Sequence, residues 1–316
     1  MKIIDDLSSV NLNSETIITI GAFDGVHRGH QHLIRQMVEE ARQAKRLAGL
    51  ITFHPHPDAV LSPYNPTRYL STPGEKAALL ETLGLDILAI LPFDQQMAET
   101  PARDFVARAR RHLHMAELWV GADFALGRAR EGNVEVLQTL GQELGFTVRV
   151  IEPVTWRGQI VSSSRIRSLI LKGEVHQAAQ LLGRYPSLAG EVVRGSQRGH
   201  CLGFPTANLE VRKERVVPAN GIYAVYARLG GDRHQGIANV GVRPSFEIGG
   251  ERMVEVHILD FNQDIYGCDL VVEFVERLRE ERRYADIEEL KAQIERDIVQ
   301  ARRILSEERK RATRDE

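Results

Sequence analysis

The sequence predicts two domains: a parallel α/β sheet domain, then an antiparallel barrel or sandwich that ends in a helix. In the first part, short apolar runs alternate with helical patterns, which is typical of a parallel sheet covered on both faces. Beyond residue 187 the hydrophobic period becomes two, and glycine-rich turns separate short strands. The string G-R-Y-P-S at 183–187 marks the change, so we expect domains over residues 1–183 and 184–316.

Composition and charge narrow the class of protein. The 316 residues include 43% hydrophobic and 27% charged ones, enough for two cores in an ordinary globular protein, and the net charge of -2 argues against a large nucleic-acid-binding surface. Cys201 and Cys268 show neither a disulfide nor a zinc pattern. No signal-peptide core is present, and no run approaches the roughly 20 apolar residues that span a bilayer. We expect a cytoplasmic protein that binds neither nucleic acid nor membranes. The oligomeric state stays open, a weak homo-oligomer included.

The first strong strand is followed by a glycine-containing turn and a helix. Ile17, Ile18 and Ile20 form a β-branched run typical of a buried strand, and Gly21 and Gly25 permit a tight turn. The helical period starts at about residue 27, with apolar residues at three- and four-residue steps: Leu33, Met37, Ala41 and Ala44.

Two histidines, His27 and His30, begin this helix in an H-x-G-H string. They share one helix face, and Gly29 leaves room beside the backbone for a ligand. A helix N-terminus presents free N–H groups, so helix and imidazoles together predict a polyphosphate site. A lone histidine near a helix start is usually a cap or a surface residue, whereas this pair after a strand and a glycine turn favours function.

The rest of the first domain continues the alternation. Strands are predicted at residues 50–53, 86–91, 118–120 and 146–151. Thr72 is the N-cap of a helix with a capping box to Glu75, and Gly84 ends it. Further helices are expected from 101 to 113, from 133 to 144 and from 174 to 182.

Two loops lie where ligands bind in open α/β sheets, just after a strand. In H-P-H-P after the 50–53 strand, His56 is our candidate for a third phosphate-facing imidazole; a rigid surface loop is the alternative. The string at 121–133, G-A-D-F-A-L-G-R-A-R-E-G-N, suits a ligand-covering loop and a plain surface loop equally well.

The string V-S-S-S-R-I-R at 161–167 combines three hydroxyls with two arginines at a helix start. A serine cap explains the hydroxyls. It does not explain Arg165 and Arg167, because positive charge at a helix N-terminus opposes the dipole unless an anion is present.

The second domain is expected to contain strands at 191–193, 221–228, 235–240, 254–259 and 270–276, and a final helix at 286–308. In P-T-A-N, Thr206 and Asn208 are hard oxygen donors two residues apart that could hold magnesium, although composition alone favours a turn. Arg243 lies in a phosphate-friendly loop at 239–246. Glu255 alternates with the apolar residues of its strand and is either a general base or a solvent-facing carboxylate.

Taken together, these strings resemble one family, the bacterial bifunctional riboflavin kinase/FAD synthetases, over nearly the whole chain. G-A-F-D-G-V-H-R-G-H, F-H-P-H-P, the 121–133 loop and V-S-S-S-R-I-R resemble the FMN adenylyltransferase module, a Rossmann-like nucleotidyltransferase. G-F-P-T-A-N-L, N-V-G-V-R-P-S-F, V-E-V-H-I-L-D-F and L-R-E-E-R-R-Y resemble the riboflavin kinase module, a six-stranded Greek-key barrel with a C-terminal helix. The resemblance implies that riboflavin and ATP give FMN in the second domain, and that FMN and ATP give FAD and pyrophosphate in the first.

The resemblance also implies residue roles in the kinase. Glu255 falls on the family's base, and Thr206 and Asn208 fall on its Mg²⁺-binding positions. Arg279 is implied as a flavin contact, less strongly than the others, and Arg243 as a cofactor contact.

In the adenylyltransferase, the FMN phosphate is the nucleophile and needs no base, because its second pKa is about 6. The resemblance implies catalytic roles for His27, His30 and Arg167, and nucleotide or flavin contacts for a larger set: Gly21, Phe23, Asp24, Gly25, His56, Asp123, Asn133, Ser163 and Ser164.

Two rival hypotheses remain. One is a nucleotidyltransferase for another phosphorylated alcohol, with the barrel only binding substrate, which predicts no phosphorylation of riboflavin. The other is a flavin-sensing binding protein, which would be expected to lack His30 or Glu255; both are present.

Overall fold

The computed structural model describes residues 1–312 except 11, 63, 65–66, 196–202 and 243–251, and it omits the side chains of 309, 311 and 312. Contacts within the chain divide it into two units, Met1–Ser163 and Ser164–Glu316. The predicted module boundary at 183/184 lies twenty residues after this division, because the helices between the two positions pack with the second unit. Of the predicted site residues, Arg243 lies outside the described residues.

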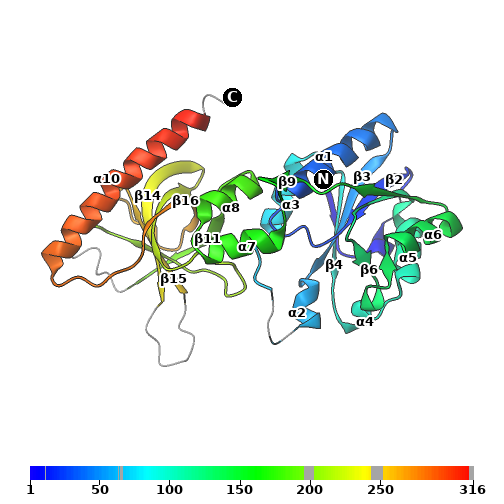
Figure 1. Ribbon diagram of the computed structural model, residues 1–316, viewed down its shortest axis with the longest axis horizontal. Helices are drawn as coiled ribbons and strands as arrows, with labels where there is room; N and C mark the ends of the chain where they lie inside the picture. Colours follow the sequence, from blue (N-terminus) through cyan, green and yellow to red (C-terminus); the bar gives the residue numbers. More distant parts are fainter. Residues whose placement is uncertain (11, 63, 65–66, 196–202, 243–251, 313–316) are drawn as a thin grey trace. The chain divides into compact units, whose positions relative to one another are not determined.

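The first unit is built on a six-stranded sheet in the order β1-β4-β3-β2-β5-β8, and every neighbouring pair is parallel (Figure 1). The strands are β1 (Lys2–Ile4), β2 (Thr16–Ile20), β3 (Leu47–His54), β4 (Ile87–Pro92), β5 (Met115–Gly121) and β8 (Thr147–Ile151). The prediction of a parallel sheet is confirmed. Edge strand β1 was not predicted, because three residues are too few to show a period.

Helices cover both faces of this sheet, as predicted. On one face, α1 (Arg28–Gln43) and α3 (Pro73–Thr82) pack on a core that includes Ile17, Leu50 and Trp119. On the other, α5 (Ala102–Leu113) and α6 (Val134–Leu144) pack on a core that includes Ile18, Ile20 and Ile51. Alternate residues of β2 thus enter opposite cores, which explains why the strand reads as an unbroken apolar run.

Helix ends follow the predicted signals closely. Thr72 caps α3 with the complete capping box to Glu75, and Gly145 ends α6 in the left-handed conformation. Ala44, predicted to lie on the apolar face of α1, instead follows the helix and is exposed, while Ile34 and Val38 are buried. Met37 and Ala41 of the predicted stripe are buried as expected, so the inward stripe overlaps the predicted one and also includes Ile34 and Val38.

Several short elements were not predicted because each is shorter than the period that would reveal it. They are η1 (Leu7–Ser9), α2 (Pro57–Leu61), α4 (Gln95–Ala98), η2 (Arg128–Arg130), the pair β6 (Ala125–Leu126) and β7 (Gly132–Asn133), and the pair β9 (Thr155–Trp156) and β10 (Gln159–Ile160).

The second unit is a closed barrel of six antiparallel strands in the order β11-β12-β15-β14-β13-β16 (Figure 1). The strands are β11 (Ser187–Val193), β12 (Ala207–Leu209), β13 (Gly221–Leu229), β14 (Asp232–Val242), β15 (Arg252–Ile258) and β16 (Asp269–Arg279). The barrel and its strand number are confirmed. Strand β12 contains part of P-T-A-N, which composition alone had assigned to a turn.

Three helices accompany the barrel: α7 (Ser163–Leu171), α8 (Val175–Leu182) and α10 (Ile287–Ala312). Helix α8 inserts Val175 into the barrel core. Helix α10 lies on the outside of the barrel, where Ala301 and Leu305 are fully buried against Ala224 and Val275. Within the described residues, no helix combines the length and apolar character needed to cross a membrane.

Candidate active sites

The first candidate site lies where the strand order of the parallel sheet reverses. From β2 the chain proceeds to β3 and β4 on one side, then returns to place β5 and β8 on the other. The carboxyl ends of β2 and β5 therefore flank a topological switch point, the place where open α/β sheets bind ligands. The turn that carries H-x-G-H leaves β2, and the 121–133 loop leaves β5.

The turn between β2 and α1 has an unusual backbone. Gly25 has φ +78°, which glycine adopts freely, but Phe23 and Val26 have φ +46° and +38°. Left-handed φ is uncommon for any side chain and most unfavourable for a β-branched one. Strain of this kind persists only where surrounding contacts determine the conformation.

Asp24 makes many of the contacts that fix the conformation of this turn. Its carboxylate is 2% exposed and accepts hydrogen bonds from the backbone N–H groups of Leu70 and Ser71, at 2.9 and 3.1 Å. The Ser163 hydroxyl donates to the backbone carbonyl of Asp24 at 2.9 Å. Both residues were predicted to bind a cofactor, and that role stays a prediction. What the geometry supports directly is that they hold the turn in place.

The two histidines stack at the N-terminus of α1. Their ring centroids are 3.6 Å apart with planes 16° from parallel. His27 is the N-cap, and its Nδ1 accepts a hydrogen bond from the backbone N–H of His30 at 3.3 Å. A Cβ on Gly29 would lie 3.1 Å from the His27 ring, so the room at Gly29 accommodates this imidazole, not a ligand as we expected. Of the pair, His30 is the more exposed.

Lys76 is a residue of this site that sequence reasoning missed. Its side chain is 8% exposed, and Nζ donates to Ala22 O at 2.6 Å and to the Thr52 hydroxyl at 3.1 Å. Burial lowers the pKa of Lys76 to about 8, with the Asp24 charge acting against the shift, so the ammonium is mostly protonated at neutral pH. The sequence could have indicated that Lys76 is buried, because it lies four residues before Leu80 and so shares the buried stripe of α3.

The charge of Lys76 also acts on His30. The pKa of His30 lies well below its ordinary value of 6.5, first because of burial, then because of His27 and Lys76. The imidazole is therefore neutral at physiological pH, so only one of its two ring nitrogens carries a proton that can be donated to a phosphate.

Substituting Lys76 by Met should raise the pKa of His30, yet leave it below 6.5, because burial is the larger cause. The His30 ring signals can be followed by NMR across a pH series and assigned with a His30→Gln variant. Lys2→Met, which removes an exposed lysine from edge strand β1, is the control and should leave the His30 titration unchanged. An unchanged His30 pKa in folded Lys76→Met protein would contradict this coupling.

Three other predicted residues of the first site act as caps or lie exposed. His56 caps α2, its Nδ1 accepting from the Asp58 backbone N–H at 3.2 Å. Asn133 caps α6, its Oδ1 accepting from the Val136 backbone N–H at 3.0 Å. Asp123 is exposed in the loop after β5. His56 follows the carboxyl end of β3, and Asp123 and Asn133 lie in the loop that follows β5. Ligand contacts by these three residues stay predictions.

Ser164 and Arg167 belong to α7, which starts at the last residue of the first unit and continues in the second. Ile170, further along α7, accepts a hydrogen bond at its carbonyl from Ala219 N of the barrel unit. The expected roles of Ser164 and Arg167 in the first reaction stay predictions.

The second candidate site is a row of side chains across five neighbouring barrel strands. Asn208 on β12 is paired with Glu255 on β15, and Glu255 with Asn239 on β14. Asn239 is in turn paired with Ile222 on β13, and Ile222 with Arg279 on β16. Residues opposite one another on adjacent strands point to the same face, so this row projects outward, while Val254 and Val256 on either side of Glu255 are buried in the barrel core.

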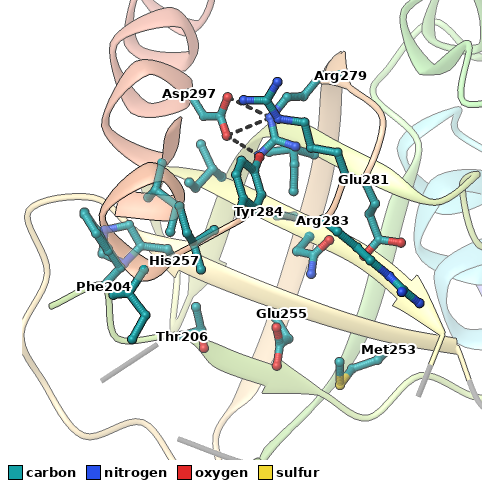
Figure 2. Close-up of a pocket in the computed structure, with 18 of the residues that line it drawn as sticks. Phe204, Thr206, Met253, Glu255, His257, Arg279, Glu281, Arg283, Tyr284 and Asp297 are labelled. Atoms are coloured by element: carbon teal, nitrogen blue, oxygen red, sulfur yellow. Dashed lines mark hydrogen bonds and ion pairs between the residues drawn. The ribbon is translucent and has the colours of Figure 1, made fainter. Parts of the chain in front are cut away.

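A cavity of about 790 Å³ opens over four members of this row, Glu255, Asn239, Ile222 and Arg279. Figure 2 shows Glu255, Thr206 and Met253 on one side of it, with Arg279, Asp297 and Tyr284 on the other. Its wall combines the barrel face with the start of α10 and the segment before it. Three residues predicted from sequence, Thr206, Glu255 and Arg279, thus line one cavity although they are far apart in the chain.

Asn208 lies at the end of the row and is covered. It is 8% exposed, and a Cβ on Gly195 would fall 2.2 Å from its carboxamide nitrogen, so a side chain at position 195 would displace this carboxamide. Thr206 lies two residues before Asn208, so both share the outer face with Glu255.

These residues fit a hard divalent cation. The hydroxyl of Thr206, the carboxamide of Asn208 and the carboxylate of Glu255 are oxygen donors of the kind that Mg²⁺ accepts, and they are too few to displace all its waters. The described residues hold no cluster of three or more His, Cys, Asp or Glu placed for a metal ion. The candidate site therefore depends on neutral oxygens together with substrate phosphates.

Arg279 is largely occupied by another residue. Its Nε and Nη2 donate to the carboxylate of Asp297 on α10 at 3.0 and 2.7 Å, and Nη1 donates to Glu280 O at 2.9 Å (Figure 2). The Asp297 side chain is only 3% exposed. A forked ion pair of this kind ties α10 to the cavity wall. The predicted flavin contact by Arg279 is untested, and any such contact would use the guanidinium face or edge left by this pairing.

A smaller cavity, of about 260 Å³, lies on the other side of Thr206. Barrel residues Val256 and Ile258 and the segment from Phe261 to Tyr266 line it. Thr206 lines both cavities, so a group bound beside it would lie between a ligand in the larger cavity and a ligand in the smaller one.

Comparison with known proteins gives the class of each part. A family model described as FAD synthetase matches residues 9–165, and one described as riboflavin kinase matches residues 182–305. The fold and its two sites thus define a two-module transferase, with one module of each kind.

Relatives of full length carry both modules. The bifunctional riboflavin kinase/FMN adenylyltransferase of Bacillus subtilis is 34% identical over 94% of this chain and 95% of its own, and that of Escherichia coli is 36% identical over 90% and 91%. A crystal structure described as a macrolide-efflux protein from Streptococcus pneumoniae, 31% identical, matches 95% of this chain and 98% of its own with a TM-score of 0.88. The chain belongs to the bifunctional riboflavin kinase/FMN adenylyltransferase family.

Proposed function

We propose that this protein phosphorylates riboflavin with ATP to give FMN, and then transfers AMP from a second ATP to FMN, giving FAD and pyrophosphate. The kinase reaction takes place on the barrel, within residues 184–316, and adenylyl transfer on the α/β domain, within residues 1–183. The observation that carries the proposal is the pair Glu255 and Asn239 in the wall of a cavity large enough for a flavin, with Asn208 next to Glu255 on the neighbouring strand. The family of the chain supplies the identity of the substrates.

In the kinase step, the terminal ribityl hydroxyl attacks the γ-phosphorus of ATP. Glu255 takes the hydroxyl proton as the new O–P bond forms, and the bond from the γ-phosphorus to the ADP oxygen breaks. Mg²⁺ bound at Thr206 and Asn208 would neutralise charge on the transferred phosphoryl group. We place the flavin in the larger cavity and the nucleotide phosphates near Thr206, because that residue faces both cavities.

In the adenylyl step, an FMN phosphate oxygen attacks the α-phosphorus of ATP, and the bond to pyrophosphate breaks. The FMN phosphate is already anionic near neutral pH, so no general base is needed. The neutral His30 imidazole and the α1 N-terminus can stabilise charge on the phosphates. Arg167, Ser163 and Ser164 are proposed to contribute to the same reaction. His27, which caps the helix and stacks on His30, would position it.

The remaining expectations are part of this proposal. The enzyme would act in the cytoplasm on riboflavin, FMN and ATP, with Mg²⁺ as the preferred divalent cation, and without nucleic-acid or membrane partners. Its association, if any, would be weak.

The direct test is to give purified protein riboflavin, ATP and Mg²⁺ and to separate the products by chromatography over time. FMN should appear first and FAD later, and both should cease when EDTA is added. FAD formed from supplied FMN, with no product from riboflavin, would favour a nucleotidyltransferase whose barrel only binds substrate. Flavin binding without any turnover would favour a sensor and overturn the proposal.

A further inference from the structure

Two residues that line the larger cavity, Asn239 and Tyr284, each have a buried polar side-chain atom with no hydrogen-bond partner among the described residues, and the one on Asn239 is an acceptor. The side-chain oxygen Oδ1 of Asn239 is buried, and among the described residues no donor hydrogen-bonds to it. A buried carbonyl oxygen left without a donor destabilises the folded chain, so such an atom calls for an explanation. Asn239 was not among the residues predicted to act in the site.

The neighbours of Asn239 on the barrel surface do not supply a donor for this oxygen. Along β14 the outward positions beside it are Ile237 and Gly241, and its partner on β13 is Ile222. On the other side lies Glu255, directly opposite on β15. An ionised carboxylate is an acceptor only, so it cannot donate to the carboxamide oxygen. Two acceptor side chains, Asn239 and Glu255, therefore lie side by side in the wall of the larger cavity, with apolar surface on the remaining side.

Side chains paired across adjacent strands have Cβ atoms roughly 4.5–5.5 Å apart. A ligand that satisfies both acceptors must therefore present two donors at short separation. A polyhydroxylated chain does so, because neighbouring carbons each carry a hydroxyl that can donate one proton. Arg279, the strong donor in the same row, does not take this part among the described residues: its three nitrogens donate to Asp297 and Glu280, and no donor hydrogen-bonds to Asn239 Oδ1.

We propose that Asn239 Oδ1 accepts a hydrogen bond from a ribityl hydroxyl close to the one that is phosphorylated, and so aligns the acceptor chain with Glu255. This inference rests on the proposed kinase function. It makes Asn239 a substrate-positioning residue that selects a vicinal polyol as the phosphoryl acceptor. No proton moves to or from Asn239 in the reaction.

The test pairs a variant with altered substrates. Asn239→Leu removes the oxygen and keeps similar bulk. Riboflavin and its 2′-, 3′- and 4′-deoxy analogues are compared with wild-type and variant protein by kcat/KM for phosphorylation. Wild type should use one of the analogues roughly tenfold to a hundredfold less well than riboflavin, the loss expected for an unsatisfied buried acceptor. Asn239→Leu should lose a similar factor on riboflavin and should no longer distinguish riboflavin from that analogue.

A merely structural role gives a different pattern. Damage to the cavity would lower activity on all four substrates by the same factor, leaving the ratio between riboflavin and each analogue as in wild type, and that result would overturn the inference. If Asn239→Leu is too slow to assay, the same ratios are measured as Kd by flavin fluorescence, with Asn239→Ala as a second variant. A circular-dichroism melt on the same preparations reports that the barrel is folded. Failure of wild type to phosphorylate riboflavin would instead reject the proposed function itself.

Discussion

Replacing Glu255 with Ala should lower riboflavin phosphorylation by about a hundredfold to ten-thousandfold, the usual contribution of a general base, while FMN is still converted to FAD. The side chain lies on the outward face of β15, in the row that lines the larger cavity. Its removal therefore deletes the proton acceptor and leaves the apolar barrel core, formed by the alternate residues of that strand, intact.

The measurement is two separate assays on one preparation, riboflavin with ATP and FMN with ATP. Glu288→Ala is the matched control, because this α10 carboxylate is 83% exposed and its surface ion pair contributes little. Loss of both activities by a folded Glu255→Ala protein would reject the assignment of two independent sites. Full kinase activity in that variant would reject Glu255 as the base.

Replacing His30 with Ala should have the opposite effect. FMN adenylylation should fall by about a hundredfold to a thousandfold, as expected when one preorganised donor to a developing charge is lost, and riboflavin phosphorylation should persist, so that FMN accumulates. The backbone N–H of residue 30, which the His27 ring caps, remains after the substitution. The helix start should therefore keep its shape while losing one imidazole.

His32→Ala serves as the control for this variant, since His32 lies on the same helix but is exposed. Adenylylation by His32→Ala at the wild-type rate would show that helix α1 tolerates substitution. If folded His30→Ala made FAD from FMN as fast as wild type, the turn after β2 would not be the adenylyl-transfer site. A circular-dichroism melt on each variant separates loss of chemistry from loss of fold.

Local patterns were sufficient to predict several features of the fold. Thr72 and Glu75 predict a capping box because the interaction spans three residues and needs no other part of the chain. The β-branched run from Ile17 predicts a strand buried on both faces for the same reason. By contrast, P-T-A-N resembles a turn in composition, and Ala207–Leu209 becomes a strand only because β15 and β11 pair with it on either side. Tertiary pairing overrides local preference there.

The candidate sites divide in the same way. Asp24 and His56 carry groups suited to a ligand, but their side chains are committed to backbone N–H groups of the protein, which only the folded chain brings near. Lys76 and Asp297 carry charge on helix faces that become buried in the fold, the first beneath the H-x-G-H turn and the second against Arg279.

The sequence by itself determined the two domains, their order and the residue types of both sites, because these depend on periodicity and on short strings. It also indicated the family, since the strings arrive in the order of the two modules. Only the tertiary structure decided which side chains act together. Asn208, Glu255 and Asn239 form one row because strand register places them opposite one another on β12, β15 and β14, and register is set by long-range pairing that no local pattern encodes.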